Sequence, residues 1–236
     1  MKKLLTLIML LMLPEVSLVG GEMPISKETK DKVRDCLVKG HAAMAFGNYD
    51  DAINWYKKTL ELDPNLADAH CFIGDVYVKK DLLDNALSEY KKAIAIQPNA
   101  LTANIGLGDI YGKRGRLEEA MAEYKKVIAI KPDSAPAHAG LGDIYFKKSK
   151  IDEALVEYKE ALSANPDYAP AHLSLGLIYR NKGLAAVAAH HLYNAGTLFF
   201  AQGNREGALQ AYENLKHTNS KDLEKSLREK LYPEVK

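Results

Sequence analysis

A 34-residue period dominates the sequence and restricts the folds that the chain can adopt. The hexapeptide GLGDIY occurs at 106–111 and 140–145, and related segments, FIGDVY and SLGLIY, occur at 72–77 and 174–179. A second motif recurs with the same step, as DAINWYKKTLELDP at 51–64, NALSEYKKAIAIQP at 85–98, EAMAEYKKVIAIKP at 119–132 and EALVEYKEALSANP at 153–166. A fixed period of this length indicates stacked copies of one supersecondary unit.

The stretch GLGDIYGKRG at 106–115 has the glycine content of a phosphate-binding loop but not its spacing. Its glycines follow G-x-G-x-x-x-G, which misses the dinucleotide-binding fingerprint by one residue, and that fingerprint also requires a preceding strand. Because the stretch is one copy of a repeated segment, we interpret it as part of a helix.

Each unit has the pattern of two helices joined by a short turn. In the copy at 135–167, one helical face at i, i+3, i+4 and i+7 contains His138, Leu141, Gly142 and Tyr145. A second stripe at i, i+4 and i+7 contains Ala154, Tyr158 and Ala161. Pro136 suits the start of the first helix, and Pro166 ends the second. One such pair cannot bury both of its faces, so neighbouring units must stack on it.

The repeat resembles the tetratricopeptide repeat (TPR), whose pattern is W-x2-L-G-x2-Y, then A-x3-F and then P. The Leu-Gly-Tyr part occurs as Leu107, Gly108 and Tyr111, as Leu141, Gly142 and Tyr145, and as Leu175, Gly176 and Tyr179. The alanine–aromatic pairs are Ala52 and Tyr56, Ala86 and Tyr90, Ala120 and Tyr124, and Ala154 and Tyr158. The Trp position holds Cys36, His70, Asn104, His138 and His172 instead. The resemblance covers 33–222 and implies an all-α, right-handed solenoid of helix-turn-helix units.

The period breaks near the C-terminus. Units are expected near 33–66, 67–100, 101–134, 135–168, 169–188 and 189–222, and the fifth of these is truncated. We expect one long Ala-rich helix over 184–202 that backs the fifth unit and opens the sixth. Residues 223–236 carry Leu223, Leu227 and Leu231 on one stripe, which predicts a C-terminal capping helix with a charged outer face.

Residues 1–21 have the pattern of a secretory signal peptide, followed by a predicted linker at 22–32. Lys2 and Lys3 precede the apolar run 4–13, and small Gly20 and Gly21 follow it. The run is too short to cross a bilayer, which needs about 20 residues. The alternative is an uncleaved anchor, in which Glu15 would be costly. We therefore expect a bacterial protein that is exported to the periplasm or secreted.

Charge and motif content exclude several classes of function. The formal net charge is +1, and the chain without residues 1–21 carries 30 basic and 30 acidic residues, which gives no electrostatic case for nucleic acid or an anionic membrane surface. No nucleophile triad, catalytic carboxylate pair, phosphate loop, zinc motif or haem motif is present in the sequence. We expect no enzymatic activity, no cofactor, no metal and no small-molecule substrate.

The histidines and cysteines have structural interpretations. His70, His138 and His172 occupy equivalent positions in units whose helices pack about 8–10 Å apart. Zinc needs nitrogens about 2 Å away, so packing between helices is favoured over a metal ladder. Cys36 and Cys71 lie on adjacent first helices, and they could form a disulfide in an oxidising compartment or remain free.

The candidate binding site follows one stripe of the first helices. Three Asp residues recur in one position, each with a Lys four residues later: Asp75 and Lys79, Asp109 and Lys113, Asp143 and Lys147. On a solvated face these would be i, i+4 ion pairs. The resemblance instead places the stripe in a concave groove, where acidic and basic rows could meet an extended peptide. The stripe also contains Cys71, Val78, Ile105, Phe146, Leu173 and Leu177, with Arg180 and Asn181 at its far end.

Two functions follow from this pattern. The first is a non-enzymatic scaffold that binds a peptide or protein segment in its groove and assists assembly of a cell-envelope complex. The alternative is a structural subunit that self-associates through the helix at 184–202, where Leu198, Phe199 and Phe200 are adjacent. We expect a monomer or a weak homo-oligomer, with membrane contact only through export or an uncleaved anchor.

Overall fold

A computed structural model describes residues 26–233, so the predicted signal peptide and the last residues of the chain lie outside the described part. The described part is entirely helical, as predicted, and contains twelve helices. They are α2 (Lys27–Ala45), α3 (Tyr49–Leu62), α4 (Ala67–Lys79), α5 (Leu83–Ile96), α6 (Leu101–Lys113), α7 (Leu117–Ile130), α8 (Ala135–Lys147), α9 (Ile151–Ala164), α10 (Ala169–Asn181), α11 (Ala185–Ala201), α12 (Arg205–Lys216) and α13 (Lys221–Leu231).

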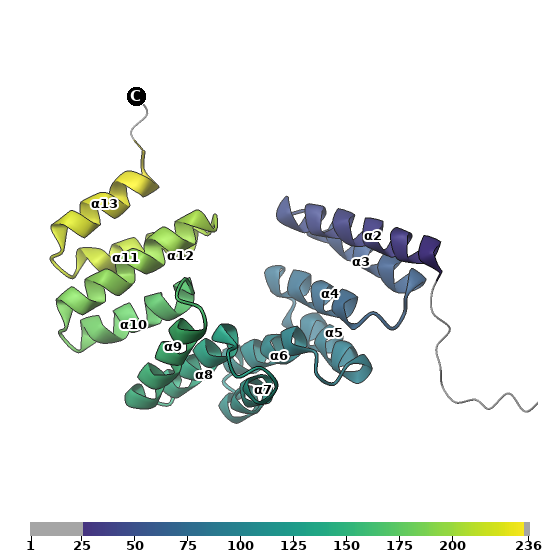
Figure 1. Ribbon diagram of the computed structural model, residues 1–236, viewed down its shortest axis with the longest axis horizontal. Coiled ribbons are helices and arrows are strands. Elements are labelled where there is room, and N and C mark those ends of the chain that lie inside the picture. The colour runs from purple at the N-terminus through teal and green to yellow at the C-terminus, as the bar shows by residue number, and fades with distance from the viewer. Residues whose placement is uncertain (1–25, 234–236) are drawn as a thin grey trace, which may run out of the picture.

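Successive helices pack in pairs, and the pairs stack into a curved array. Each odd-numbered helix from α3 to α11 packs most extensively on the helix before it, and then contacts the first helix of the next pair. Figure 1 shows the array curving from α2 round to α13, with its two ends on opposite sides of an open space. The first helices α4, α6 and α8 contact one another in sequence, so they form one continuous face.

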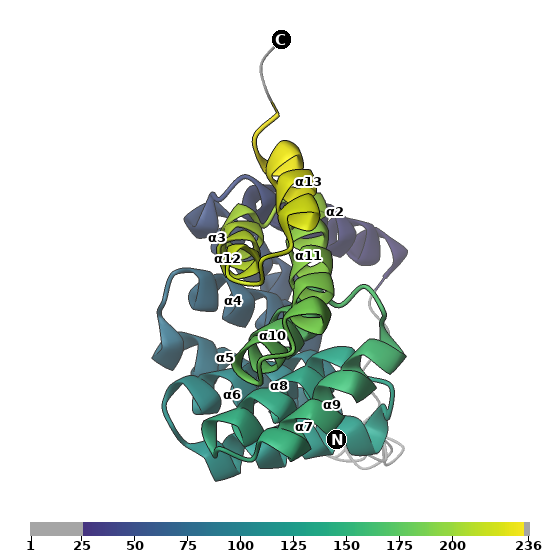
Figure 2. The same ribbon diagram turned by 90° about the vertical axis from the view of Figure 1, so that its left-hand side faces the viewer.

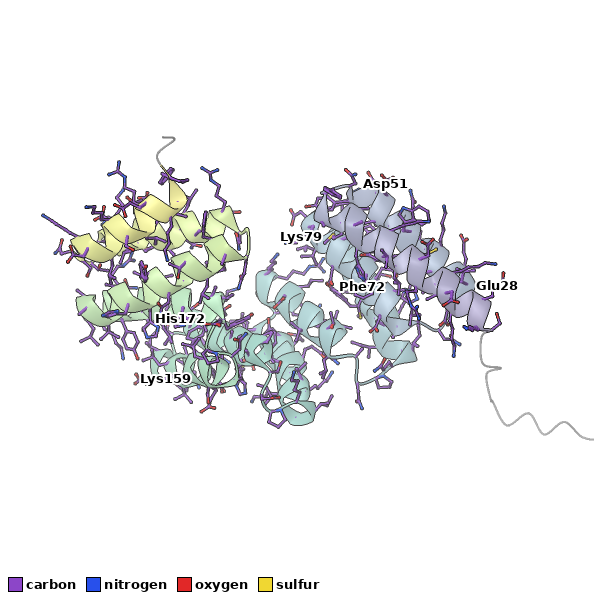
Figure 3. The ribbon with its side chains drawn as sticks, turned by 45° about the horizontal axis from the view of Figure 1, so that its top comes forward. Glu28, Asp51, Phe72, Lys79, Lys159 and His172 are labelled. Atoms are coloured by element: carbon purple, nitrogen blue, oxygen red, sulfur yellow. The ribbon has the colours of Figure 1, made fainter. Side chains whose placement is uncertain are left out.

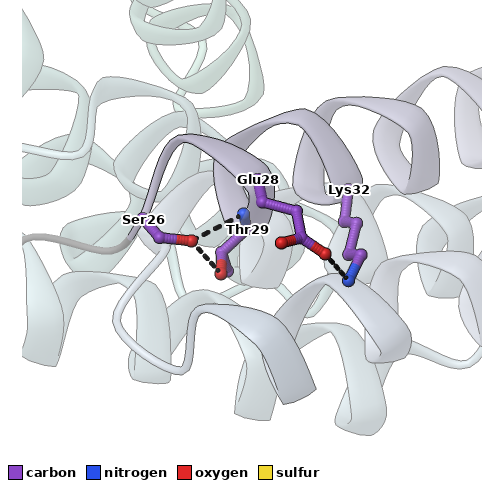
Figure 4. Close-up of polar contacts among 4 residues, drawn as sticks. All are labelled: Ser26, Glu28, Thr29 and Lys32. Atoms are coloured by element: carbon purple, nitrogen blue, oxygen red, sulfur yellow. Dashed lines mark hydrogen bonds and ion pairs between the residues drawn. The ribbon is translucent and has the colours of Figure 1, made fainter.

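The first helix begins earlier than the sequence repeat suggests. The linker was predicted to extend to residue 32, whereas α2 starts at Lys27. Ser26 caps this helix, because its hydroxyl accepts a hydrogen bond from the Thr29 amide at 3.1 Å (Figure 4). Glu28 and Lys32 form an i, i+4 pair at 2.6 Å on the exposed side of the same turns.

The turn inside each of the first five units contains one residue in the left-handed conformation. Gly47, Asp81, Gly115, Ser149 and Gly183 occupy this position, with φ between 57° and 76°. A left-handed residue after a helix lets the backbone reverse direction and satisfy the last carbonyl groups. Glycine adopts this conformation without steric cost, and Asp81 and Ser149 adopt it with a side chain present.

The C-terminal end is built differently from the preceding units. Helix α11 packs against α10 on one side and against α12 on the other, so a single helix contributes to two pairs. Helix α13 contacts both α11 and α12 and lies over the end of the array (Figure 2). The Leu227 side chain is fully buried there, in the space left by the missing side chain of Gly196.

Both cysteines are free and buried, so the structure contains no disulfide between Cys36 and Cys71. Within 26–233, none of the helices has the length and apolar character that a membrane span requires.

Candidate functional site

A groove with a volume of about 670 Å³ lies on the face formed by α4, α6 and α8. Nine predicted groove residues line it: Asp75, Val78, Lys79, Ile105, Asp109, Lys113, Asp143, Phe146 and Lys147. Met44 of α2 closes one end. Tyr90 and Tyr124 also line the groove, although they belong to the second helices of their units.

The three groove aspartates are fixed by tyrosines from the second helices. The hydroxyl groups of Tyr90, Tyr124 and Tyr158 donate to Oδ1 of Asp75, Asp109 and Asp143 respectively, each at 2.6 Å. All three tyrosines are buried, and Tyr90 and Tyr124 line the groove. This repeated contact was not predicted, because the tyrosines were interpreted only as packing residues. The signal in the sequence is an Asp followed by a Tyr 15 residues later, repeated in three units.

Glycines provide the space through which these tyrosines pass. A Cβ atom on Gly74, in the tyrosine's own unit, would lie 2.6 Å from Cε1 of Tyr90. A Cβ atom on Gly106, in the next unit, would lie 2.5 Å from Cε2 of the same ring. Tyr124 is enclosed in the same way by Gly108 and Gly140. The two glycines of the GLGDIY motif therefore accommodate two tyrosines, one from the same unit and one from the unit before.

The Asp–Tyr pair of the three central units is replaced by other residues in the first and fifth units. In the first unit the equivalent position is His41, whose Nδ1 lies 2.8 Å from the Tyr56 hydroxyl. The His41 ring also packs edge-on against Phe72 of α4, with ring centroids 4.7 Å apart. In the fifth unit the equivalent pair is Leu177 and Leu192, which is apolar. At this repeated position, a carboxylate therefore occurs only in the second, third and fourth of these five units.

The groove environment disfavours charge on the aspartates. Water reaches Asp109 and Asp143, which are exposed, but the surrounding protein displaces part of their hydration shell. This desolvation raises the pKa of Asp75, Asp109 and Asp143 above the ordinary range of a carboxyl group. The neighbouring carboxylates Asp143 and Asp75 further raise the pKa of Asp109, while the Tyr124 hydroxyl and the Lys113 ammonium group lower it.

The i, i+4 ion pairs that a solvated face would favour between these aspartates and lysines are absent among the described residues. The aspartates accept hydrogen bonds from tyrosines instead, and Lys147 donates to the carbonyl oxygen of Gly112 at 2.7 Å. Lys79 lies at the end of α4 that faces the open space (Figure 3). The row of aspartates and the row of lysines both line the groove. Each aspartate, however, is held by a tyrosine and not by the lysine on its own helix.

Five other predicted groove residues lie outside the pocket. Cys71 is 2% exposed and belongs to the core, so its thiol does not reach the groove surface. Burial raises the pKa of this thiol to about 12, which makes it unreactive. Leu173 packs against the C-terminal core, and Leu177 is half-buried. Arg180 donates to the side-chain oxygens of Asn214 and Asn181, so its guanidinium is engaged between α10 and α12.

The histidines in the repeated Trp position contact the second helix of their own pair, and Nε2 of His138 and of His172 also lies 2.8 and 2.9 Å from the carbonyl oxygens of Pro132 and Pro166 in the preceding units. Nδ1 of His70 lies 2.6 Å from Glu89, and Nδ1 of His138 lies 2.7 Å from Glu157. In the fifth unit, Nδ1 of His172 lies 2.9 Å from Nδ1 of His191. No group of three metal-ligating side chains occurs in the part of the chain that the structure describes.

Paired helices, stacked units and a lined groove define a helical-repeat interaction scaffold. The chain matches the TPR repeat at 40–81, 74–115, 108–149 and 142–183, and the tetratricopeptide repeat at 192–221. These segments span most of the chain, which therefore belongs to the TPR family. TPR proteins are generally non-enzymatic scaffolds, and their domains bind protein or peptide partners.

Several solved structures are similar to this fold. The MamA protein is 25% identical with a TM-score of 0.54, and the match covers 74% of this chain and 95% of that one. PilF of Pseudomonas aeruginosa is 22% identical with a TM-score of 0.65, covering 89% and 96%. PilW, a type IV pilus biogenesis factor, is 21% identical with a TM-score of 0.60, covering 86% and 99%. No curated protein sequence matches the chain.

Proposed function

We propose that this protein is an exported scaffold that binds a segment of a partner protein in its groove and assists assembly of a cell-envelope complex. The observation that carries the proposal is the groove itself, which combines half-buried and exposed apolar side chains with two rows of charged groups that make no ion pairs with each other among the described residues. Phe146, for example, is 43% exposed although it lines a pocket. An exposed apolar surface of this kind is typical of interaction sites.

The cellular setting rests on residues outside the described part. The charged start, the apolar run 4–13 and Gly20–Gly21 support export, with cleavage near residue 21. The fold is compatible with an envelope role, because PilW, which has a similar fold, is a type IV pilus biogenesis factor.

Self-association through α11 is a second candidate function. Of the three residues predicted for this interface, Phe200 is 44% exposed and Leu198 is half-buried, whereas Phe199 is 7% exposed and packs in the core. Leu184 and Val187, at the start of the helix, are 48% and 43% exposed. The exposed apolar side chains at the two ends of α11 would favour contact with another copy of the chain.

Site-specific photocrosslinking in intact cells distinguishes these functions. A benzophenone amino acid is placed at Phe146 in the groove, at Val187 on α11, or at Val156, which is 57% exposed on the outer helix α9 and serves as control. We expect an adduct with another protein from Phe146, recovered from the periplasmic fraction, and none from Val156. An adduct of twice the chain mass from Val187 alone would favour self-association, and cytoplasmic adducts would contradict export.

A further inference from the structure

If the groove binds a protein segment, as proposed above, its fixed charges determine which kind of segment fits. The Asp75, Asp109 and Asp143 carboxylates are each held by a neutral hydroxyl donor, so their negative charge is not compensated by that contact. Asp109 lies between the other two and experiences repulsion from both, together with attraction to Lys113. A cationic group on a ligand would therefore be attracted to this row more strongly than a neutral or anionic group.

The lysine row is already partly compensated. Lys79, Lys113 and Lys147 each lie in the last turn of their helix, where the carbonyl groups favour positive charge. Lys147 also donates to the Gly112 carbonyl. The aspartates lie in the helix interiors, away from the helix ends, and each is attracted by the lysine four residues later without forming an ion pair with it among the described residues. Their positions are also fixed by buried tyrosines, whereas a lysine loses rotamer freedom when it binds.

The floor of the groove suits the aliphatic part of a basic side chain. Val78 and Ile105 are half-buried, and Phe146 is exposed, beside the acidic row. Lysine and arginine carry several methylene groups behind the charged end, and these groups pack on apolar surface while the charge stays in water or meets a carboxylate. A single basic side chain can therefore satisfy both parts of the groove wall.

The spacing of the aspartates limits the conformation of the ligand. Each carboxylate comes from the next first helix, and packed helices lie about 8–10 Å apart. A polyproline II segment has three residues per turn and rises about 3.1 Å per residue, so residues i and i+3 share a face about 9 Å apart. The row of aspartates is bounded by His41 in the first unit and Leu177 in the fifth, so it offers three carboxylates to a ligand.

We propose that the groove selects an extended partner segment that carries Lys or Arg at every third residue over three positions, with each cation on one of Asp75, Asp109 and Asp143.

Synthetic peptides test this selection directly. Fluorescent peptides contain Lys-Pro-Pro three times, Glu-Pro-Pro three times, or three adjacent lysines followed by six prolines. Binding to the full chain is measured by fluorescence anisotropy. We expect the spaced lysine peptide to bind about tenfold more tightly than the other two, because three modest ion pairs add. Equal binding of the spaced and clustered lysine peptides would overturn the spacing, and tighter binding of the glutamate peptide would overturn the proposal.

Variants assign the effect to the groove. Asp75→Asn, Asp109→Asn and Asp143→Asn together remove the charges but keep an oxygen that accepts the tyrosine hydrogen bond. The control, Asp133→Asn, Asp167→Asn and Asp222→Asn, makes the same change in net charge at exposed positions outside the groove. We expect about a tenfold loss for the groove variant and less than a twofold loss for the control. Equal losses would show attraction to overall charge only and would overturn the proposal.

Two further measurements keep the test decisive. If the triple variant does not fold, Asp109→Asn alone is measured, and added NaCl must weaken binding of the spaced lysine peptide to the unaltered chain. Sequencing of the peptide crosslinked at Phe146 separates this inference from the proposed function. A groove adduct with an acidic segment would leave the scaffold function standing and overturn the basic-segment proposal.

Discussion

Gly106 shows how one absent methyl group permits two units to stack. Its backbone lies against the Tyr90 ring of the preceding unit, and the same ring carries the hydroxyl that holds Asp75. Packing between units and the geometry of the groove therefore depend on the same residue. A side chain at this position would have to move the ring, because the ring is buried between two helices and has no free volume to enter.

Comparison of two glycines on α6 tests this dependence. In Gly106→Ala the new Cβ would lie 2.5 Å from the Tyr90 ring, whereas in Gly112→Ala it would lie 3.1 Å from Cδ1 at the end of the Ile144 side chain. Both variants gain helix propensity, so their difference isolates the clash. We expect Gly106→Ala to be less stable than Gly112→Ala by about 1–3 kcal/mol in urea unfolding. Equal midpoints would show that Tyr90 can move without cost.

His191 gives the second prediction at the scale of single residues. Burial, together with His172, His190 and Lys159, lowers the pKa of His191 from 6.5 to about 4. The folded state therefore holds this ring neutral, and its contribution to stability is present above pH 6.5 and is lost as pH falls toward 4. Figure 3 shows His172 and Lys159 in the same part of the array.

Between pH 7 and pH 5, this shift corresponds to about 2 kcal/mol of lost unfolding free energy. The raised pKa values of Asp75, Asp109 and Asp143 act in the opposite direction, so the informative quantity is a difference between variants. We expect the unaltered chain to lose about 2 kcal/mol more than His191→Gln over this range. The control is His217→Gln at an exposed position. The prediction fails if His191→Gln retains the full pH dependence.

At the scale of helices, the sequence determined most of the fold because each unit repeats the same packing residues. Small residues such as Gly142 and Ala154 recur with aromatic partners, and this consistency specifies helix pairs without knowledge of the long-range contacts. The break in period also has a visible cause in the structure, since α11 serves two pairs in place of two separate helices.

The groove contacts were less accessible to sequence reasoning. An i, i+4 spacing shows only which residues are neighbours on one helix, so Asp109 and Lys113 looked like partners. The actual partner, Tyr124, comes from a different helix and reaches Asp109 through space left by glycine. The assignment of Cys71 to the groove was wrong for a related reason. Residues on neighbouring faces of a short helix can be one position apart in the sequence, and the Cys71 thiol faces the core.

On the scale of the whole molecule, ion pairs connect successive units along one rim. Lys80 pairs with Asp50, Arg114 with Asp84, Lys148 with Glu118 and Lys182 with Asp152, at 2.5–3.2 Å. Each pair joins the end of a first helix to the start of the preceding second helix, and each contributes about 0–1 kcal/mol. The series stops in the next unit, where Ala186 occupies the position equivalent to Asp152. The C-terminal helices are therefore attached without this pairing.

At the C-terminal end, apolar packing beneath α13 stabilises the array instead of ion pairs. The variant Leu227→Ala tests how far along the array this stabilisation extends. Leu227 is fully buried against Gly196, so truncation should cost about 2–5 kcal/mol. Each unit of a repeat array contacts only its neighbours, so we expect faster amide hydrogen exchange in α11–α13 and unchanged protection in α4–α9. Leu107→Ala, at a buried position in α6, should show the reverse distribution. If both variants instead lose protection uniformly, the array unfolds as one cooperative unit and its stability is not local to each pair of helices.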